Sequence, residues 1–437
     1  MVFKIKKEKI FFLILFMYVS FARTLNLINT NFVFITLATI YILFFKRDLD
    51  LFYLLIIFLI PNLNLFLFNG IPLINILIAI SLLWLFFSKK IYLNIRENNF
   101  FIFIVIFIAY DLIHFLFNDY FNIFENIILY LSILSAYFFY IYLKKENSME
   151  KYLNYFIYGT MSSLISGLLF MISTGKFSNG INITNRNLGN AGDPNYLGLY
   201  ILISIIFLIN QIKENGFSFN KLLIIIFLGI GGFSTSSRSF MLLLIIEILP
   251  FIYILFVDFI KKFKLKKILL IGIAIVICVF FLRIFSENID FIYSRFDNAT
   301  NLNELTNGRS DIAMLYLNKL TSSGMRTLFG YGINKYPVNM EIFEYAHNAY
   351  IEILVTVGII GVLSIIFLLI YVISTVKIKI WSIKFLPIII FCIISFSINI
   401  VEVECFYFLI VIIFKYSSKN KFNYDFKGIN KMNDILS

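Results

Sequence analysis

The feature that most constrains the fold is a series of apolar runs, separated by short polar connections, along a chain of 437 residues. An apolar segment of about 20 residues can cross a bilayer as a helix, because a helix satisfies its own backbone hydrogen bonds in lipid. We therefore predict an all-α, polytopic integral membrane helical bundle with about 12–14 transmembrane helices and one large extracytoplasmic loop containing short helices. The fourteen runs are residues 10–22, 28–45, 51–68, 71–88, 100–117, 125–143, 153–173, 195–212, 221–235, 239–257, 268–285, 348–375, 385–400 and 402–415.

The composition of the chain supports this prediction. Hydrophobic residues make up 60% of it and charged residues 14%, whereas a soluble domain carries about 25% charged residues. No soluble core could bury so much apolar surface, so lipid has to face most of it. The net charge of +12 would suggest nucleic-acid binding in a soluble protein. Here the positive-inside rule explains the charge, and we expect no nucleic-acid partner.

The distribution of positive charge predicts the topology. With the N-terminus in the cytoplasm, 27 of the 37 Lys and Arg residues fall on the inner side and 10 on the outer side. One span more or fewer would put the lysine-rich loops on both sides, so we expect both termini to be cytoplasmic. The first run also resembles a signal peptide with "SFA" as a weak cleavage site, but we favour a retained span.

The predicted spans divide the chain into four parts. Residues 1–285 contain helices 1–11 and a smaller outer loop at 174–195, residues 286–347 form the large extracytoplasmic loop, residues 348–416 contain helices 12–14, and residues 417–437 form a cytoplasmic tail. The large loop has 62 residues, with seven acidic and five basic side chains. It is too long to be a simple connection, and long loops on a rigid scaffold commonly carry function.

Arginine and lysine are distributed differently. On the predicted topology 25 of the 28 lysines lie inside, whereas seven of the nine arginines lie outside. A guanidinium group binds phosphate through two parallel N–H donors and keeps its charge when partly buried. The outer arginines therefore suggest a phosphorylated ligand on that face, although pairing with local acids would also explain any one of them. They are Arg23, Arg186, Arg238, Arg283, Arg295, Arg309 and Arg326.

Within the large loop, "NGRSDIAMLYLNKL" predicts the start of a helix. Gly308 permits a turn, Ser310 can cap the helix, and Asp311 suits the first turn. Arg309 would then lie beside the amides of a helix N-terminus, where anions bind readily. The alternative is an ordinary amphipathic helix with a solvated arginine. The predicted apolar stripe of this helix consists of Ile312, Leu315, Tyr316 and Leu320.

Three further polar residues lie at predicted outer boundaries. Arg238, in the tight hairpin "FSTSSRSF", has almost no loop around it and should lie at the rim of the bundle, where a charge usually marks function or a buried partner. Asp193 and Pro194 are sufficiently explained as the start of a helix. His347 is a histidine, whose unperturbed pKa of about 6.5 suits removal of a proton from a hydroxyl.

Other candidate chemistry is weaker. Asp111 and His114 lie one helical turn apart, and we favour a satisfied polar pair over a proton relay. The chain has only two histidines, shows no zinc-ligand spacing and carries no Walker or dinucleotide motif. We therefore expect neither a metal site nor a cofactor.

From about Asn187 to Thr375 the chain resembles the superfamily of O-antigen ligases and O-antigen polymerases. The resemblance is carried by "GDPNYLGLY", "TSSRSFMLLL", "GRSDIAMLY…LFGYG" and "HNAYIEILVTVGIIG". None of these stretches is a strict motif, but their order and their placement around one large external loop make the match fairly specific. The first half of the chain has only generic hydrophobic similarity.

The resemblance implies a bacterial inner-membrane transferase that acts on the extracytoplasmic side without metal or nucleotide sugar. It would move a glycan from undecaprenyl diphosphate to a sugar hydroxyl, with a glycan or the lipopolysaccharide core as acceptor. Arg238 and Arg309 match the family's diphosphate-binding arginines, and Arg186 matches more weakly. His347 matches the family's histidine, a candidate base for the acceptor hydroxyl. The bilayer and other polysaccharide-assembly proteins would be further partners.

Polymerases and ligases share this chemistry and differ in the acceptor. We lean towards a polymerase, because polymerases occur in bacteria with and without an outer membrane. The alternative from another class is a transporter, such as a flippase for lipid-linked sugars, but that would place its polar residues near the bilayer midplane and often contain inverted repeats. A scaffolding role would leave the outer arginines unexplained.

Overall fold

The computed structural model describes the larger part of the chain. Predicted runs 28–45 and 268–285, and the first part of the large loop, lie outside the described residues apart from single positions. The described residues are 7–25, 48–65, 67–68, 71–87, 95–114, 123–145, 149–175, 186–261, 308–333, 340–342, 344–376, 382–400, 403 and 405–418, together with Thr39, Ile42, Gly272, Val279 and Arg283.

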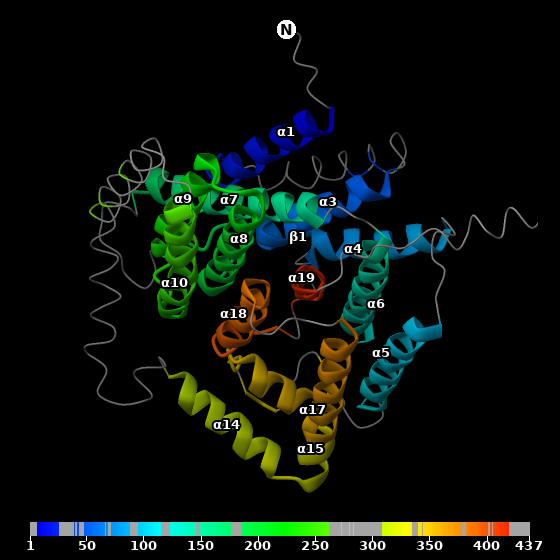
Figure 1. The fold of residues 1–437 in the computed structure, drawn as a ribbon. Coiled ribbons are helices and arrows are strands. Elements are labelled where there is room, and N and C mark those ends of the chain that lie inside the picture. Colours follow the sequence, from blue (N-terminus) through cyan, green and yellow to red (C-terminus); the bar gives the residue numbers. More distant parts are fainter. Residues whose placement is uncertain are drawn as a thin grey trace, which may run out of the picture.

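The described part of the chain is a helical bundle (Figure 1). A single short antiparallel ladder interrupts it, in which Leu67 pairs with Pro72 and Phe68 with Ile71. The first half consists of α1 (Lys7–Ala22), α3 (Leu49–Leu59), η2 (Ile60–Leu65), β1 (Leu67–Phe68), β2 (Ile71–Pro72), α4 (Leu73–Phe87), α5 (Ile95–Ile113), α6 (Ile123–Lys145) and α7 (Met149–Ser173). The second half consists of α8 (Pro194–Asn215), α9 (Phe219–Phe233), α10 (Arg238–Lys261), α14 (Arg309–Thr321), α15 (Gly324–Phe329), α17 (Ala349–Val376), η5 (Ile383–Phe385), α18 (Leu386–Ile394) and α19 (Cys405–Ser417).

The architecture is that of a polytopic membrane protein, as the sequence predicted. Among the described residues, four helices are long and apolar enough to cross a bilayer, and several apolar helices are shorter. The total of 12–14 spans and the four-part division of the chain stay predictions. The four long segments are Asn126–Leu143, Met149–Ser173, Pro194–Asn215 and Ala349–Tyr371.

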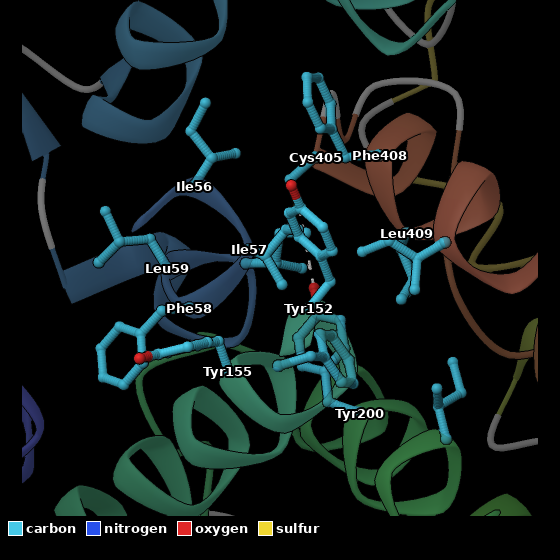
Figure 2. Packing of buried hydrophobic residues seen from close by; sticks show 14 of the residues in the cluster. Ile56, Ile57, Phe58, Leu59, Tyr152, Tyr155, Tyr200, Cys405, Phe408 and Leu409 are labelled. Atoms are coloured by element: carbon cyan, nitrogen blue, oxygen red, sulfur yellow. Dashed lines mark hydrogen bonds between the residues drawn. The ribbon is translucent and has the colours of Figure 1, made fainter. Parts of the chain in front are cut away.

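Helix α8 is the most buried of the four long apolar helices among the described residues. In its apolar segment 94% of the residues are buried inside the protein. In the apolar segment of α17 only 28% are buried, and the other residues are available to contact lipid. Tyr200 of α8 lies in a buried cluster with Tyr152 of α7, Ile57 of α3 and Phe408 of α19 (Figure 2). Side chains in such a core are close-packed, so groups attached to the end of α8 are held on a rigid support.

Two predicted spans are interrupted. Run 51–68 is α3 followed by η2, with a kink at Asn62, whose buried amide donates to Phe58 O at 3.1 Å and to Gly159 O at 3.1 Å. Run 385–400 is also not one helix, because α18 ends at Ile394 and residues 395–400 are not helical. Both breaks contain polar residues within the apolar runs, Asn62 and Asn64 in the first and Ser395, Ser397 and Asn399 in the second.

Helix α17 is broken at Gly358, which has φ 63° and ψ −173°. The carbonyls released by the break accept hydrogen bonds from the end of the large loop: Tyr331 N lies 2.8 Å from Val355 O, and Gly332 N lies 2.8 Å from Thr356 O. Main chain therefore replaces the missing helical hydrogen bonds, as a buried backbone requires. The break divides α17 into a short segment that begins near His347 and a longer segment with exposed apolar side chains.

The end of α5 holds the same loop segment. Asp111 Oδ1 accepts from Ile333 N at 2.7 Å, and its Oδ2 accepts from Tyr130 Oη. His114 Nε2 donates to Phe329 O at 2.9 Å. Asp111 and His114 thus both hold residues 329–333 in place, although Nδ1 of His114 is buried without a hydrogen-bond partner among the described residues. The choice between a polar pair and a proton relay stays a prediction.

Candidate active site

His347 lies immediately before α17 in a constrained backbone conformation. Its φ is 47°, a left-handed value that is uncommon for residues other than glycine. Asn348 follows as the N-cap of α17, because its Oδ1 accepts from Tyr350 N at 3.0 Å and from Ile351 N at 3.3 Å. Ala346, on the other side, is fully buried. The backbone at His347 is therefore constrained on both sides, and the residue is half-buried.

Arg309 is the first residue of α14. Gly308, with φ 80°, occupies the N-cap position, so the prediction of Ser310 as the cap is wrong: Ser310 lies inside the first turn. The half-buried guanidinium donates from Nη1 to Ser397 O at 3.1 Å. The predicted stripe of α14 needs one correction, since Leu315 is 52% exposed while Tyr316 and Leu320 are buried.

The charges of Arg309, Asp193 and Glu344 act on His347. Burial is the largest cause that lowers the pKa of His347 from 6.5, and the positive charge of Arg309 lowers it further. Asp193 and Glu344 act in the opposite direction, but the net shift is downward. Burial also lowers the pKa of Arg309, and Asp193 opposes that shift. His347, Arg309 and Asp193 thus form one electrostatic group, drawn from three separate elements.

Asp193 has the structural role that the sequence predicted. It is the N-cap of α8, with Oδ1 accepting from Asn195 N at 2.6 Å and from Tyr196 N at 3.3 Å, and Pro194 follows in the first turn. Its additional role as the acid facing Arg309 and His347 could not be read from the sequence, because the cap alone accounts for the motif.

Arg238 is the first residue of α10 and follows the hairpin 234–237. Both of its chain neighbours contact other elements: Ser237 Oγ donates to Asn195 Oδ1 at 2.8 Å, and Ser239 Oγ donates to Ser397 Oγ at 3.0 Å. Ser397 is also the residue whose carbonyl accepts from Arg309. The structure therefore brings the α10 terminus and the α14 terminus to the same short segment.

Arg186 lies beside the same hairpin. Its Nε donates to Thr235 O at 2.9 Å, and the next residue, Asn187, donates from its backbone N to Ser234 O at 2.9 Å. Arg186 and Arg238 are thus attached to the two sides of one tight turn. Arg326, in contrast, packs on the ring of Tyr331 at 4.8 Å from its centroid, on the far part of the large loop.

Residues 395–400, "SFSINI", are the part of the site that the sequence reasoning missed. Besides its contacts with Arg309 and Ser239, this segment is bonded to α17, where Ala349 N donates to Ser395 O at 2.8 Å and the buried Glu352 carboxylate accepts from Ile400 N at 2.8 Å. Tyr196 of α8 donates to Asn399 O at 3.1 Å. Polar residues at every second position were an available signal, since they do not match the helical period of 3.6.

Main-chain carbonyl groups anchor three of the arginines. Arg309 donates to Ser397 O, Arg186 to Thr235 O, and Arg23 to Gly189 O at 2.5 Å. A carbonyl oxygen orients a guanidinium group but carries no formal charge, so it leaves the positive charge in place.

The fold and this site define a class: a helical membrane protein with arginine and histidine gathered where several helices end. The comparison with known families agrees, because the O-antigen ligase family matches residues 223–366. The resemblance seen in the sequence is thereby confirmed over residues 223–366, a range that includes Arg238, Arg309 and His347. Asp193, Arg186 and residues 395–400 lie outside the matched range. No curated protein and no solved structure matches the chain.

Proposed function

We propose that this protein is a membrane glycosyltransferase that moves a glycan from undecaprenyl diphosphate to a sugar hydroxyl, without a metal ion. The O-antigen ligase match supports glycosyltransferase activity of the ligase or polymerase type. The proposed donor and mechanism rest on one observation: the half-buried imidazole of His347 is grouped with the half-buried guanidinium of Arg309, beside Asp193. His347 offers a base of suitable pKa, and Arg309 offers a fixed positive charge.

In the proposed reaction, His347 accepts the proton of the acceptor hydroxyl while the acceptor oxygen attacks the anomeric carbon of the donor sugar. The bond between that carbon and the diphosphate oxygen breaks, and undecaprenyl diphosphate leaves with its electron pair. Negative charge therefore builds up on the diphosphate in the transition state. Arg309 and Arg238 stabilise that charge, with Arg186 as a further contact, because preorganised donors act strongly where water is excluded.

The lowered pKa of His347 fits this role. A base has to be unprotonated before it acts, and burial together with Arg309 keeps the imidazole neutral at neutral pH. The positive charge of Arg309 disfavours a protonated His347. Negative charge that develops on the leaving diphosphate offsets this effect, so proton transfer to His347 and stabilisation of the leaving group are coupled.

The location of the reaction follows the sequence-based topology. We place the site on the extracytoplasmic face of a bacterial inner membrane, with both termini in the cytoplasm. We propose a polymerase rather than a ligase, with a lipid-linked glycan rather than the lipopolysaccharide core as acceptor.

The test is genetic and chemical. Deleting the gene and complementing it with wild type, His347→Ala or Arg309→Ala separates the alternatives when surface and lipid-linked glycans are run on gels. Single repeats on the final acceptor indicate a polymerase, and long chains left on undecaprenyl diphosphate indicate a ligase. Lipid-linked repeats that accumulate on the cytoplasmic face would support the flippase alternative, and full complementation by both variants would contradict the proposed chemistry.

A further inference from the structure

A diphosphate has two phosphoryl groups a fixed distance apart, so two arginines that bind it have to be held at a matching separation. Arg238 and Arg309 come from helices that are 71 residues apart in the sequence, and each lies at a helix N-terminus. The fold must contain something that connects these two termini. One buried side chain does so through the contacts of both of its polar atoms.

That side chain is Asn195, which is 6% exposed and lies in the first turn of α8. Its Oδ1 accepts from the hydroxyl of Ser237, the residue before Arg238, at 2.8 Å. Its Nδ2 lies 3.5 Å from Ser397 O, the carbonyl oxygen that also accepts from Arg309. A continuous path of contacts therefore leads from one arginine to the other through a single amide.

We propose that Asn195 is a positioning residue that sets the separation of Arg238 and Arg309 and thereby the selectivity of the site for a diphosphate over a monophosphate. This inference rests on the proposed function, because it assumes that both arginines bind the same lipid-linked diphosphate. The amide is suited to the task since it donates and accepts at the same time, which neither a carboxylate nor an alanine can do.

The location of Asn195 supports the inference. It belongs to α8, the most buried of the four long apolar helices among the described residues. It therefore offers a fixed reference point for the first residues of α10 and α14, two helices that have several exposed apolar side chains. The contact of Ser239 with Ser397 provides a second link between α10 and residues 395–400, at 3.0 Å. Loss of Asn195 should therefore loosen the spacing of the arginines without detaching either helix.

The experiment measures binding of undecaprenyl diphosphate and undecaprenyl monophosphate to the full-length protein in nanodiscs. Wild type should prefer the diphosphate, and Arg238→Ala or Arg309→Ala should remove that preference. Asn195→Ala should reduce the preference about tenfold while leaving the affinity for the monophosphate unchanged. Ser237→Ala removes the link to Asn195 from the hairpin side, together with the contact of the Ser237 hydroxyl with Phe240 N at 3.4 Å, and should also reduce the preference for the diphosphate. Asn210→Ala, the same substitution at a buried position of the same helix, is the matched control.

The outcomes distinguish failure of the positioning role of Asn195 from failure of the proposed function. If the arginine variants lose diphosphate preference but Asn195→Ala and Ser237→Ala keep it, the positioning role is wrong and the proposed function stands. If Asn195→Ala weakens both lipids equally, Asn195 only supports the fold, and the inference is again wrong. If wild type has no preference for the diphosphate, or the arginine variants leave the preference intact, the proposed function fails and the inference fails with it.

Discussion

Arg309 donates a hydrogen bond to the carbonyl oxygen of Ser397 at 3.1 Å, across 88 residues of sequence. This contact joins the helix of the large loop to a non-helical segment near the end of the chain. It orients a half-buried guanidinium group toward the region of His347 and Asp193, whose charges influence one another. The candidate site thus depends on a contact between a residue that sequence analysis singled out and one that it passed over.

Arg309→Ala should lower the turnover number about 10²- to 10³-fold, because removal of one preorganised donor to a developing negative charge has that effect. Arg309→Lys should recover part of the rate, since it keeps the charge but loses the planar fork. The measurement is glycan transfer in nanodiscs with a lipid-diphosphate donor. Arg326→Ala is the control, as that arginine packs on Tyr331 in the same loop. Equal rates for the two alanine variants would contradict a role for Arg309 in the reaction.

The rate should depend on pH through His347. A base acts in its neutral form, and the pKa of His347 is lowered from 6.5, so activity should be full at neutral pH and fall as the pH drops through this lowered value. Glu344→Gln removes a negative charge that raises this pKa, so the acidic limb should move to lower pH. Glu341→Gln, in the same loop but paired with Lys319 at 3.7 Å, should leave the limb in place. A limb that moves upward in Glu344→Gln would argue against His347 as the base.

Gly358→Ala should destabilise the protein by about 2 kcal/mol or more, because the added methyl group would lie 2.4 Å from Leu328 O and φ is 63°. Gly330→Ala should do the same from the other side, since its methyl group would lie 2.4 Å from Thr356 O. Gly229→Ala is the matched control, as that glycine is helical and open, and it should be neutral or slightly stabilising. Thermal unfolding in detergent measures the stability of all three variants. Similar unfolding temperatures would show that the backbone around Gly330 and the backbone around Gly358 do not approach as closely as described.

Asp111→Ala should destabilise the protein by about 1–3 kcal/mol, because it leaves the Ile333 amide and the Tyr130 hydroxyl without their carboxylate partner. Asp111→Asn should recover part of the loss, since an amide oxygen can still accept from one of the two. If Asp111 instead relays protons, Asp111→Asn should abolish activity while thermal stability is retained. Parallel measurement of unfolding temperature and transfer rate separates these results.

The sequence predicted the features that depend on composition and local pattern. Membrane insertion followed from apolar length, the start of α8 from Asp193 and Pro194, and the helix after Gly308 from its turn and amphipathic spacing. His347, Arg309 and Arg238 could be nominated because each is a polar residue at the boundary of an apolar run. These inferences need only neighbouring residues.

The contacts between distant segments could not be predicted in the same way. Nothing local to "SFSINI" indicates that it contacts α8, α10, α14 and α17, and hydropathy reads it as the end of a membrane span. The break at Gly358 is equally hidden, because the hydrogen bonds that compensate for it come from residues 331 and 332. Long-range hydrogen bonds of this kind depend on the packing of the whole bundle.

The carbonyl anchors of Arg309 and Arg186 have a consequence for how such a protein diversifies. A carbonyl oxygen is present whatever side chain its residue carries, so the bonds to the two arginines do not depend on the side chains of Ser397 and Thr235. The arginines proposed to bind the phosphates would keep these anchors while nearby side chains are replaced to fit a different sugar. A new glycan specificity could then evolve without altering the main-chain atoms that hold the arginines.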